Sequence, residues 1–391
     1  SGRVEPDVAD RGIGKGELDF VAMGRKLLAD PHLPNKLAAG EPEKVRPCIY
    51  CYTCISAIYM GDSARCAVNA NLGLEFEGGP ARAAPGKAKH VAVIGGGPGG
   101  MESARRLAAL GHKVTLIEKG DRLGGTLRFA SLAYEPNERI LNWLIREVKE
   151  AGIDVRLGTA ATPDLLRSLG VDEVIVATGA IRGMPEIPGG DLSHVFSGDD
   201  MRKMVLGESS EELKRKTGLF TRLATKVGAA TGATANLALV RKATHAWMPL
   251  GDKVVIIGGE LVGLELAEFL QERGRTVSVI EEGPRMGKGL TLVRRMRILA
   301  ELGHHGVGLH AGASGIAIGK DAVTFTAADG STQSVAADTV IVAKGAAGDL
   351  TLAESLEAAG FTVHAIGDAT GVGYIEGAMR GARNAVNKVA A

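Results

Sequence analysis

The chain has 391 residues, which is too long for a single hydrophobic core and predicts two or three domains. Its 46 basic and 45 acidic side chains are well mixed and leave a net charge of +1, which argues against a nucleic-acid or membrane-surface partner. Because the chain has no long apolar run, no signal-peptide layout and only four clustered cysteines, we expect a soluble cytoplasmic protein without a disulfide framework.

The four cysteines all lie in the stretch RPCIYCYTCISAIYMGDSARC, residues 46–66. Their spacing is C-x2-C-x2-C-x11-C, at Cys48, Cys51, Cys54 and Cys66. Four thiolates suit either a tetrahedral zinc ion or a [4Fe–4S] cluster. Zinc sites usually pair two C-x2-C knuckles, whereas three close cysteines and a distant fourth favour the cluster. A structural zinc site is the alternative.

Residues 90–120, HVAVIGGGPGGMESARRLAALGHKVTLIEKG, predict a strand, a glycine turn, a helix and a second strand. Gly95, Gly97 and Gly100 have G-x-G-x-x-G spacing, which allows a tight turn, a close pyrophosphate and close helix packing. The helix directs its free N–H groups towards the phosphates. Glu118, 23 residues after the first glycine, can accept both ribose hydroxyls. This setting predicts a dinucleotide site, with a plain glycine-rich turn as the alternative.

Residues 171–180, VDEVIVATGA, predict a strand that ends in a Thr-Gly turn, and residues 338–348, DTVIVAKGAAG, repeat the pattern. Between them, residues 200–250 form a long insertion. Apolar residues at helical spacing predict a packed helical hairpin there, and a docking surface for a partner subunit or acceptor is the alternative. These residues are Phe220, Leu223, Ala224 and Val227.

The strand–glycine–helix unit recurs at residues 253–283, KVVIIGGELVGLELAEFLQERGRTVSVIEEG. Gly258 and Gly263 match the first and third glycines, and Glu281 again follows the first glycine by 23 residues. The middle glycine is replaced by Glu260, so the nucleotide is displaced or bound weakly, unless the unit is only a scaffold. Acids at 281 and 282 repel a 2′-phosphate and favour NADH over NADPH.

Near the C-terminus, HAIGDATGVGYIEGAMRGARNAVNKVA predicts a strand, a Gly-Asp turn and a closing helix. An acid at this place can accept a hydrogen bond from a sugar-like hydroxyl. Two units about 160 residues apart, with a strand returning at the end, predict an α/β fold of two nested dinucleotide-binding domains.

With these motifs the chain resembles the flavoprotein reductases that have two dinucleotide domains, the first for FAD and the second for NAD(P)H. The loop RPCIxCxxC…CxVN, placed directly before the first unit, resembles that of the 2,4-dienoyl-CoA reductase and trimethylamine dehydrogenase family of iron–sulfur flavoproteins. Many members have proline after the asparagine, where this chain has Ala70, and the difference changes no ligand.

The resemblance implies roles for single residues. Glu118 would bind the adenosine ribose of FAD and Asp368 its ribityl chain, while Glu265 would lie near the nicotinamide or, alternatively, be an ordinary exposed helix residue. The other residues implied to line FAD are Gly95, Gly97, Pro98, Gly100, Lys119, Arg122, Gly124, Gly125, Thr178, Gly179 and Gly367. Those implied to line the NAD site are Gly258, Gly259, Gly263 and Glu281.

Residues 16–40, GELDFVAMGRKLLADPHLPNKLAAG, resemble the last strand and helix of the family's N-terminal (β/α)8 barrel, which binds FMN. Gly24 and Arg25 match the residues that hold the FMN phosphate. One strand cannot close a barrel or hold FMN. We therefore expect a fragment of a longer enzyme, with a barrel on another chain as the alternative.

The domain division expected from these patterns is 1–40 (barrel tail), 41–76 (cluster loop), 77–88 (linker), 89–199 and 361–391 (FAD domain), 200–250 (insertion) and 251–360 (NAD(H) domain).

The function hypothesis is that electrons pass from NADH through FAD and the cluster to FMN in the barrel, which reduces an activated C=C bond of an enoyl- or dienoyl-type substrate. The alternatives are reversed flow as in trimethylamine dehydrogenase, an NADH:acceptor diaphorase subunit, and a non-catalytic assembly module. The insertion could also serve a homo-oligomer.

Overall fold

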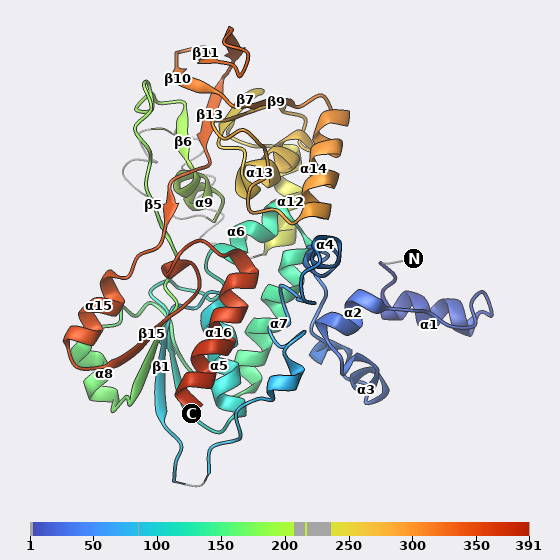
Figure 1. The fold of residues 1–391 in the computed structure, drawn as a ribbon, viewed down its shortest axis with the longest axis vertical. Coiled ribbons are helices and arrows are strands. Elements are labelled where there is room, and N and C mark those ends of the chain that lie inside the picture. The colour runs from blue at the N-terminus through green and yellow to red at the C-terminus, as the bar shows by residue number, and fades with distance from the viewer. Residues whose placement is uncertain (1–2, 85, 207–215, 217–235, 391) are drawn as a thin grey trace.

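The computed structural model describes residues 3–84, 86–206, 216 and 236–390. In this part of the chain two α/β units lie one above the other, and the N-terminal helices lie to one side (Figure 1). The residues on which the helical hairpin was predicted, Phe220, Leu223, Ala224 and Val227, lie outside the described residues.

The first unit is a five-stranded, all-parallel sheet in the order β15-β4-β1-β2-β3. Successive side chains of a strand point to opposite faces of the sheet, and both faces are covered by helices. In β1, Val91 and Val93 pack with α5, α7 and α16, while Ala92 and Ile94 pack with α8 and α15. The strands are β1 (His90–Ile94), β2 (Lys113–Ile117), β3 (Asp154–Arg156), β4 (Glu173–Val176) and β15 (Thr362–Ala365). The helices are α5 (Pro98–Ala109), α6 (Thr126–Ala133), α7 (Pro136–Glu150), α8 (Pro163–Leu169), α15 (Thr351–Ala358) and α16 (Tyr374–Ala390).

The second unit has another all-parallel sheet, in the order β6-β13-β7-β8-β9. One face packs on α13 and α14, and the other packs on an antiparallel sheet of β10, β11 and β12. The strands are β6 (Val195–Ser197), β7 (Lys253–Ile257), β8 (Thr276–Glu281), β9 (Gly308–Ala311), β10 (Ser314–Ile318), β11 (Ala322–Thr326), β12 (Thr332–Ala336) and β13 (Thr339–Val342). The helices are α9 (Gly198–Leu206), α12 (Leu237–Ala246), α13 (Leu261–Gln271) and α14 (Leu292–His304).

The chain leaves the first unit and returns to it through two adjacent segments, β5 (Ile181–Arg182) and β14 (Ala346–Ala347), which pair antiparallel. Both changes of unit come earlier than the sequence boundaries of 199 and 360 suggest. Strand β6 pairs with β13 in the second sheet, and α15 packs its Ala353 and Leu356 against the first sheet. Strand β6 has only three residues, and so short a sequence does not indicate which of the two sheets it joins. The boundary near β6 was misplaced for this reason.

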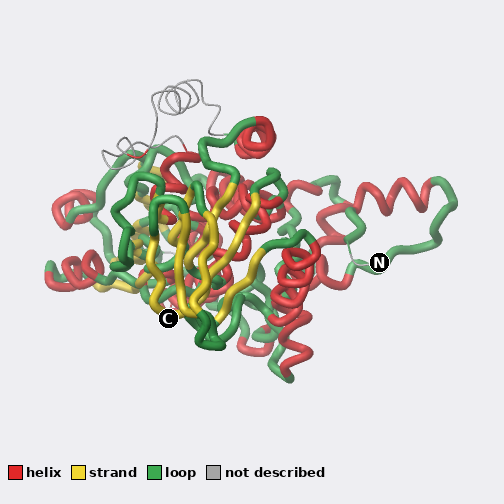
Figure 2. The backbone as a smooth tube through the Cα atoms, turned by 90° about the horizontal axis from the view of Figure 1, so that it is seen from above, coloured by secondary structure: helices red, strands yellow, loops and turns green. Residues whose placement is uncertain are grey.

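The N-terminal segment contains α1 (Pro6–Gly14), α2 (Gly24–Ala29), α3 (Leu33–Ala38) and α4 (Thr53–Met60). Helix α1 and the loop after it project away from the two units (Figures 1 and 2). The strand expected before Gly24 does not form, and residues 17–23 have no regular secondary structure. A strand needs a neighbouring strand for its backbone hydrogen bonds, and no described strand lies beside this segment. Phe20 is 82% exposed as a result.

None of the described helices has both the length and the apolar character required to cross a membrane.

Candidate dinucleotide sites and cysteine centre

The glycine turn after β1 has two positions that exclude any side chain and one that is open. A Cβ on Gly95, which has φ +108°, would lie 2.4 Å from the carbonyl oxygen of Ala177, and one on Gly100 would lie 1.8 Å from that of Gly95. Gly97 has extended backbone (φ −73°, ψ −178°), and a Cβ there would meet no atom within 4 Å. Its role is therefore to leave space in front of α5, which starts at Pro98.

Glu118 is held at the end of β2 by two backbone amides. Its Oε2 accepts the N–H of Gly96 and its Oε1 accepts the N–H of Gly120, both with an N···O distance of 2.6 Å. The following loop returns to the same turn, because the N–H of Gly124 donates to the carbonyl of Gly96 at 2.8 Å. In this loop Arg122 forms an ion pair with Asp121. Lys119 and Gly125, at the two ends of the loop, are exposed.

The remaining residues predicted for FAD lie at the carboxyl ends of neighbouring strands. The Thr178-Gly179 turn follows β4 and the Gly367-Asp368 turn follows β15, and β15, β4 and β1 are adjacent in the sheet. Asp368 Oδ1 accepts the N–H groups of Gly373 (2.9 Å) and Tyr374 (3.1 Å) and so caps α16. The structure therefore brings the predicted FAD residues to one edge of the sheet, where ligands of such sheets bind.

The second unit repeats this arrangement after β7. A Cβ on Gly258 would lie 2.9 Å from the carbonyl oxygen of Ala343, and one on Gly263 would lie 1.8 Å from that of Gly258. The Glu281 carboxylate again accepts two backbone amides, from Gly259 and Gly283, both at 2.6 Å. The second unit therefore keeps the local geometry of a dinucleotide turn.

Glu265 on α13 is not an exposed helix residue, since 14% of its side chain is accessible. Burial raises its pKa to about 7, the Arg294 guanidinium 3.9 Å away opposes the rise, and Glu268 adds to it. Arg294 donates to Glu268 at 2.6 Å and lies 4.7 Å from the centre of the Tyr134 ring. Arg294 and Tyr134 belong to different units and to no motif, so no sequence signal pointed to them.

The four cysteines are free thiols in one segment of the N-terminal region. Cys48 and Cys66 are buried, and Cys51 and Cys54 are half-buried. Backbone N–H groups donate to the sulfurs of Cys48, Cys54 and Cys66, from Tyr50, Ile55, Val68 and Asn69. Such contacts stabilise negative charge on a sulfur atom, as a metal-bound thiolate of either kind would carry it.

Burial raises the pKa of three thiols, that of Cys66 to about 12, and the neighbouring Cys51 adds to the rise at each of them. The four side chains therefore lie within electrostatic reach of one another. Within the described ranges, no three His, Cys, Asp or Glu side chains are arranged as ligands around one metal ion.

The backbone between the cysteines turns twice through the left-handed region, at Tyr50 (φ 54°) and Tyr52 (φ 61°). This conformation is costly for residues with a side chain. Contacts of the buried Tyr50 compensate for it, since its hydroxyl donates to Glu5 (2.8 Å) and accepts from Lys26 (3.0 Å). Arg25 lies against both rings, 5.3 Å and 5.1 Å from their centres, whereas Gly24 beside it has open space at its Cα.

The cysteine loop contacts both dinucleotide units. The Tyr134 hydroxyl of the first unit donates to the carbonyl of Tyr50 at 3.2 Å. In the second unit, Thr291 donates to the carbonyl of Cys51 at 3.0 Å, and the N–H of Val293 donates to Ser56 at 3.1 Å. The loop is therefore fixed at the junction of the two units.

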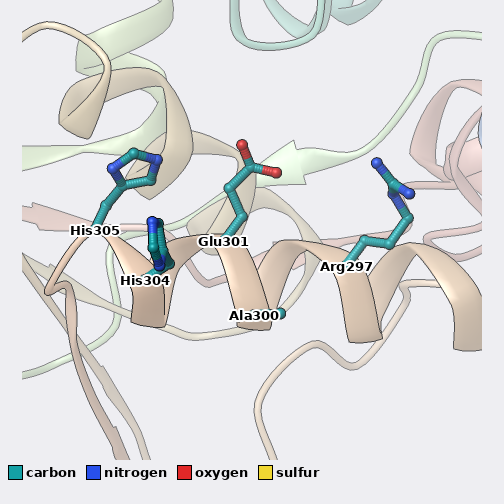
Figure 3. Close-up of a pocket in the computed structure, with 5 residues that line it drawn as sticks. All are labelled: Arg297, Ala300, Glu301, His304 and His305. Carbon is teal, nitrogen blue, oxygen red and sulfur yellow. The ribbon is translucent and has the colours of Figure 1, made fainter.

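A hollow of about 320 Å³ lies on α14 (Figure 3). It is lined by Arg297, Ala300, Glu301, His304 and His305. The two histidine rings meet edge to face with centres 5.5 Å apart, and the Arg297 guanidinium lies 5.6 Å from the Tyr52 ring. No side chain from the dinucleotide turns or cysteines lines this hollow.

Comparison with known proteins agrees with a fold of two dinucleotide-binding units. The family model for pyridine nucleotide-disulphide oxidoreductases matches residues 68–164 and 89–372. The chain is 34% identical over 368 residues to a bilirubin reductase of Mediterraneibacter gnavus (93% of this chain, 50% of the relative) and 31% identical over 382 residues to an NADH oxidase of Thermoanaerobacter brockii (95% and 52%). A solved 2-naphthoyl-CoA reductase in complex with 2-naphthoyl-CoA superposes with a TM-score of 0.80 at 27% identity, over 98% of this chain and 52% of that one. The chain thus spans about half the length of these relatives.

Proposed function

Because this chain belongs to the pyridine nucleotide-disulphide oxidoreductase family, among the flavoproteins related to 2,4-dienoyl-CoA reductase and trimethylamine dehydrogenase, we propose that it is the electron-transfer part of an NADH-dependent oxidoreductase. In this proposal FAD binds the first unit, NADH the second, and a [4Fe–4S] cluster the four cysteines. FAD supplies the ability to accept a hydride and release its electrons singly. The main support is the cysteine loop, which makes hydrogen bonds to both units.

The residues at the first sheet edge fit an FAD molecule. Gly97 leaves open space before the N-terminus of α5, where a pyrophosphate binds favourably. The two backbone amides that donate to Glu118 orient its carboxylate towards the place of the ribose hydroxyls. Asp368 uses one carboxylate oxygen to cap α16, and its second oxygen is available to the ribityl chain.

The second unit fits a pyridine nucleotide through Gly258, Gly259, Gly263 and Glu281. Two acids at the end of β8 favour NADH, because a 2′-phosphate would meet like charge there. Lys344 pairs with Glu282 and moderates this repulsion, whereas the Glu281 carboxylate accepts the N–H groups of Gly259 and Gly283. Because the pKa of Glu265 is about 7, its carboxyl group can hold a proton near the nicotinamide.

Cys48, Cys51, Cys54 and Cys66 would ligate the cluster as deprotonated thiolates. Gly24 and Arg25 would contribute to an FMN phosphate site that residues corresponding to the unmatched half of the relatives would complete. The relatives reduce bilirubin and 2-naphthoyl-CoA. We therefore propose an unsaturated, conjugated compound of enoyl type as the final electron acceptor.

The test is anaerobic purification followed by assays of iron, sulfide and flavin. We expect about four irons and one FAD per chain, and bleaching of the flavin by NADH at a much lower concentration than by NADPH. Zinc in place of iron, or a protein without flavin, contradicts the proposal. A Cys54→Ser variant is the matched control, since it removes one cluster ligand and leaves both dinucleotide units unchanged.

A further inference from the structure

The second dinucleotide unit repeats one contact of the first with different chemistry. In the first unit Gly97 faces Gly125, so closely that a Cβ on Gly125 would lie 3.3 Å from the Cα of Gly97. The corresponding residues of the second unit are Glu260 and Lys288. Their side chains form an ion pair, with 3.2 Å between Lys288 Nζ and Glu260 Oε1. Two residues that leave space are therefore replaced by two paired charges.

The correspondence rests on position as well as on sequence. Gly125 is seven residues after Glu118, and Lys288 is seven residues after Glu281. The two loops make the same backbone contact, from the N–H of Gly124 to the carbonyl of Gly96 at 2.8 Å and from the N–H of Gly287 to the carbonyl of Gly259 at 2.7 Å. The loop of the second unit thus lies across the start of α13 as its counterpart lies across α5.

The backbone at Glu260 does not require glycine. Its φ and ψ are −77° and −170°, close to the −73° and −178° of Gly97, and any residue adopts this extended conformation. What the glutamate changes is the space and charge before the helix N-terminus. A pyrophosphate at that place needs the carboxylate to move away and a positive charge to come near.

The ion pair between Glu260 and Lys288 is weak enough for its two side chains to change partners. The two side chains are 44% and 83% exposed, and an exposed ion pair of this kind contributes only about 0–1 kcal/mol. A pyrophosphate carries two negative charges and also attracts the helix N-terminus, so it is the stronger partner for a lysine. We propose that Lys288 is a pyrophosphate ligand of the second unit, which pairs with Glu260 in the free protein and changes partner when the nucleotide binds.

The loop itself is confined by the first unit. Tyr374, at the start of α16, places its hydroxyl 2.2 Å from where a Cβ on Gly289 would lie. Gly289 follows Lys288 directly and has φ +85°. The exchange is therefore a movement of two side chains on a backbone that is fixed from both sides. The inference deepens the proposed function, because it assumes that this unit binds a pyridine nucleotide.

The experiment measures flavin reduction by NADH in a stopped-flow instrument, which separates the dissociation constant from the limiting rate. Lys288→Gln, Glu260→Gln and the double variant remove charge with little change in size, and Lys320→Gln is the control at an exposed lysine of the β10–β11 turn. We expect Lys288→Gln to raise the dissociation constant about ten-fold and Glu260→Gln to lower it about three-fold. The double variant should bind about three-fold more weakly than wild type, because it lacks the lysine ligand as well as the repelling carboxylate, and the limiting rate should be unchanged throughout.

The exchange is overturned if Lys288→Gln behaves as Lys320→Gln does, or if Glu260→Gln weakens binding. A wild-type flavin that NADH does not reduce contradicts the proposed function instead. In that case calorimetric titration of the same variants with ADP-ribose decides the exchange without electron transfer. The same order of affinities supports it, and equal affinities or no binding at all overturn it.

Discussion

A substitution of Glu102 on α5 tests how the cysteine loop, residues 46–66, is fixed to the first unit. Its side chain is fully buried and binds two guanidiniums, Arg105 at 2.6 and 2.8 Å and Arg106 at 2.5 Å. Arg105 stacks on one side of Trp143, and Arg46 from the cysteine segment also stacks on this ring, at 5.0 and 4.9 Å from its centre. The carboxylate thus holds together a cluster of cations that joins the two parts.

Burial alone would raise the pKa of Glu102, but Arg105, Arg106 and Arg46 lower it from its usual 4.5 to about 2. At about 1.36 kcal/mol per pKa unit, this difference corresponds to about 3 kcal/mol of stability. Because the folded-state pKa is lowered, the contribution is complete above pH 4.5 and is lost as the pH falls towards 2. Glu102→Gln should therefore lower the free energy of unfolding by about 3 kcal/mol at pH 7, and by less than half of that at pH 3.

The assay is urea unfolding followed by the fluorescence of the buried Trp143. A loss of about 3 kcal/mol lowers the midpoint by roughly 1 to 3 M urea. Glu147→Gln is the matched control, since Glu147 also faces Arg105, at 4.0 Å, but burial raises its pKa and its charge is disfavoured. We expect no loss of stability from that change at pH 7. An equal loss in both variants, or a Glu102→Gln effect that stays constant from pH 7 to pH 3, refutes the reasoning.

Three further predictions concern the dinucleotide units. Glu265 has a folded-state pKa of about 7 against its usual 4.5, so its contribution to stability is complete below pH 4.5 and is lost as the pH rises through 7. Glu265→Gln should match wild type in unfolding free energy at pH 4.5 and exceed it by up to about 3 kcal/mol at pH 8, and equal stability at pH 8 would contradict the burial argument. Gly100→Ala should destabilise the protein by about 1–3 kcal/mol or prevent folding, because its Cβ would lie 1.8 Å from a carbonyl oxygen. Gly97→Ala should leave the melting temperature of the flavin-free protein unchanged and lower the flavin content, and the opposite order of effects would show that the open space has no role in binding.

The sequence predicts those features of the fold that short-range patterns determine. The run His90–Ile94 is β1 without any change of boundary, since five consecutive buried residues are typical of a strand inside a parallel sheet. The acid 23 residues after the first glycine lies directly after β2 in the first unit and is the last residue of β8 in the second, and in both its carboxylate meets the glycine turn. The spacing of these residues is fixed by one strand, one turn and one helix, so it can be read without the rest of the chain.

Features that depend on distant segments were missed or misplaced. The strand expected before Gly24 fails because it has no neighbour in the described residues, and periodicity cannot report a missing partner. The Arg294–Tyr134 contact joins two units through residues that belong to no motif. Glu260 was recognised as unusual, but its pairing with Lys288 appears only when the loop after β8 is seen to lie across α13.

The central claim, that electrons pass from NADH through the flavin to the four cysteines, is tested most directly by anaerobic titration with NADH followed by electron paramagnetic resonance. The account predicts that the wild type develops the signal of a reduced [4Fe–4S] cluster as the flavin bleaches, and that Cys54→Ser bleaches without this signal. A wild type whose flavin is fully reduced by NADH while its cluster stays oxidised would contradict the account.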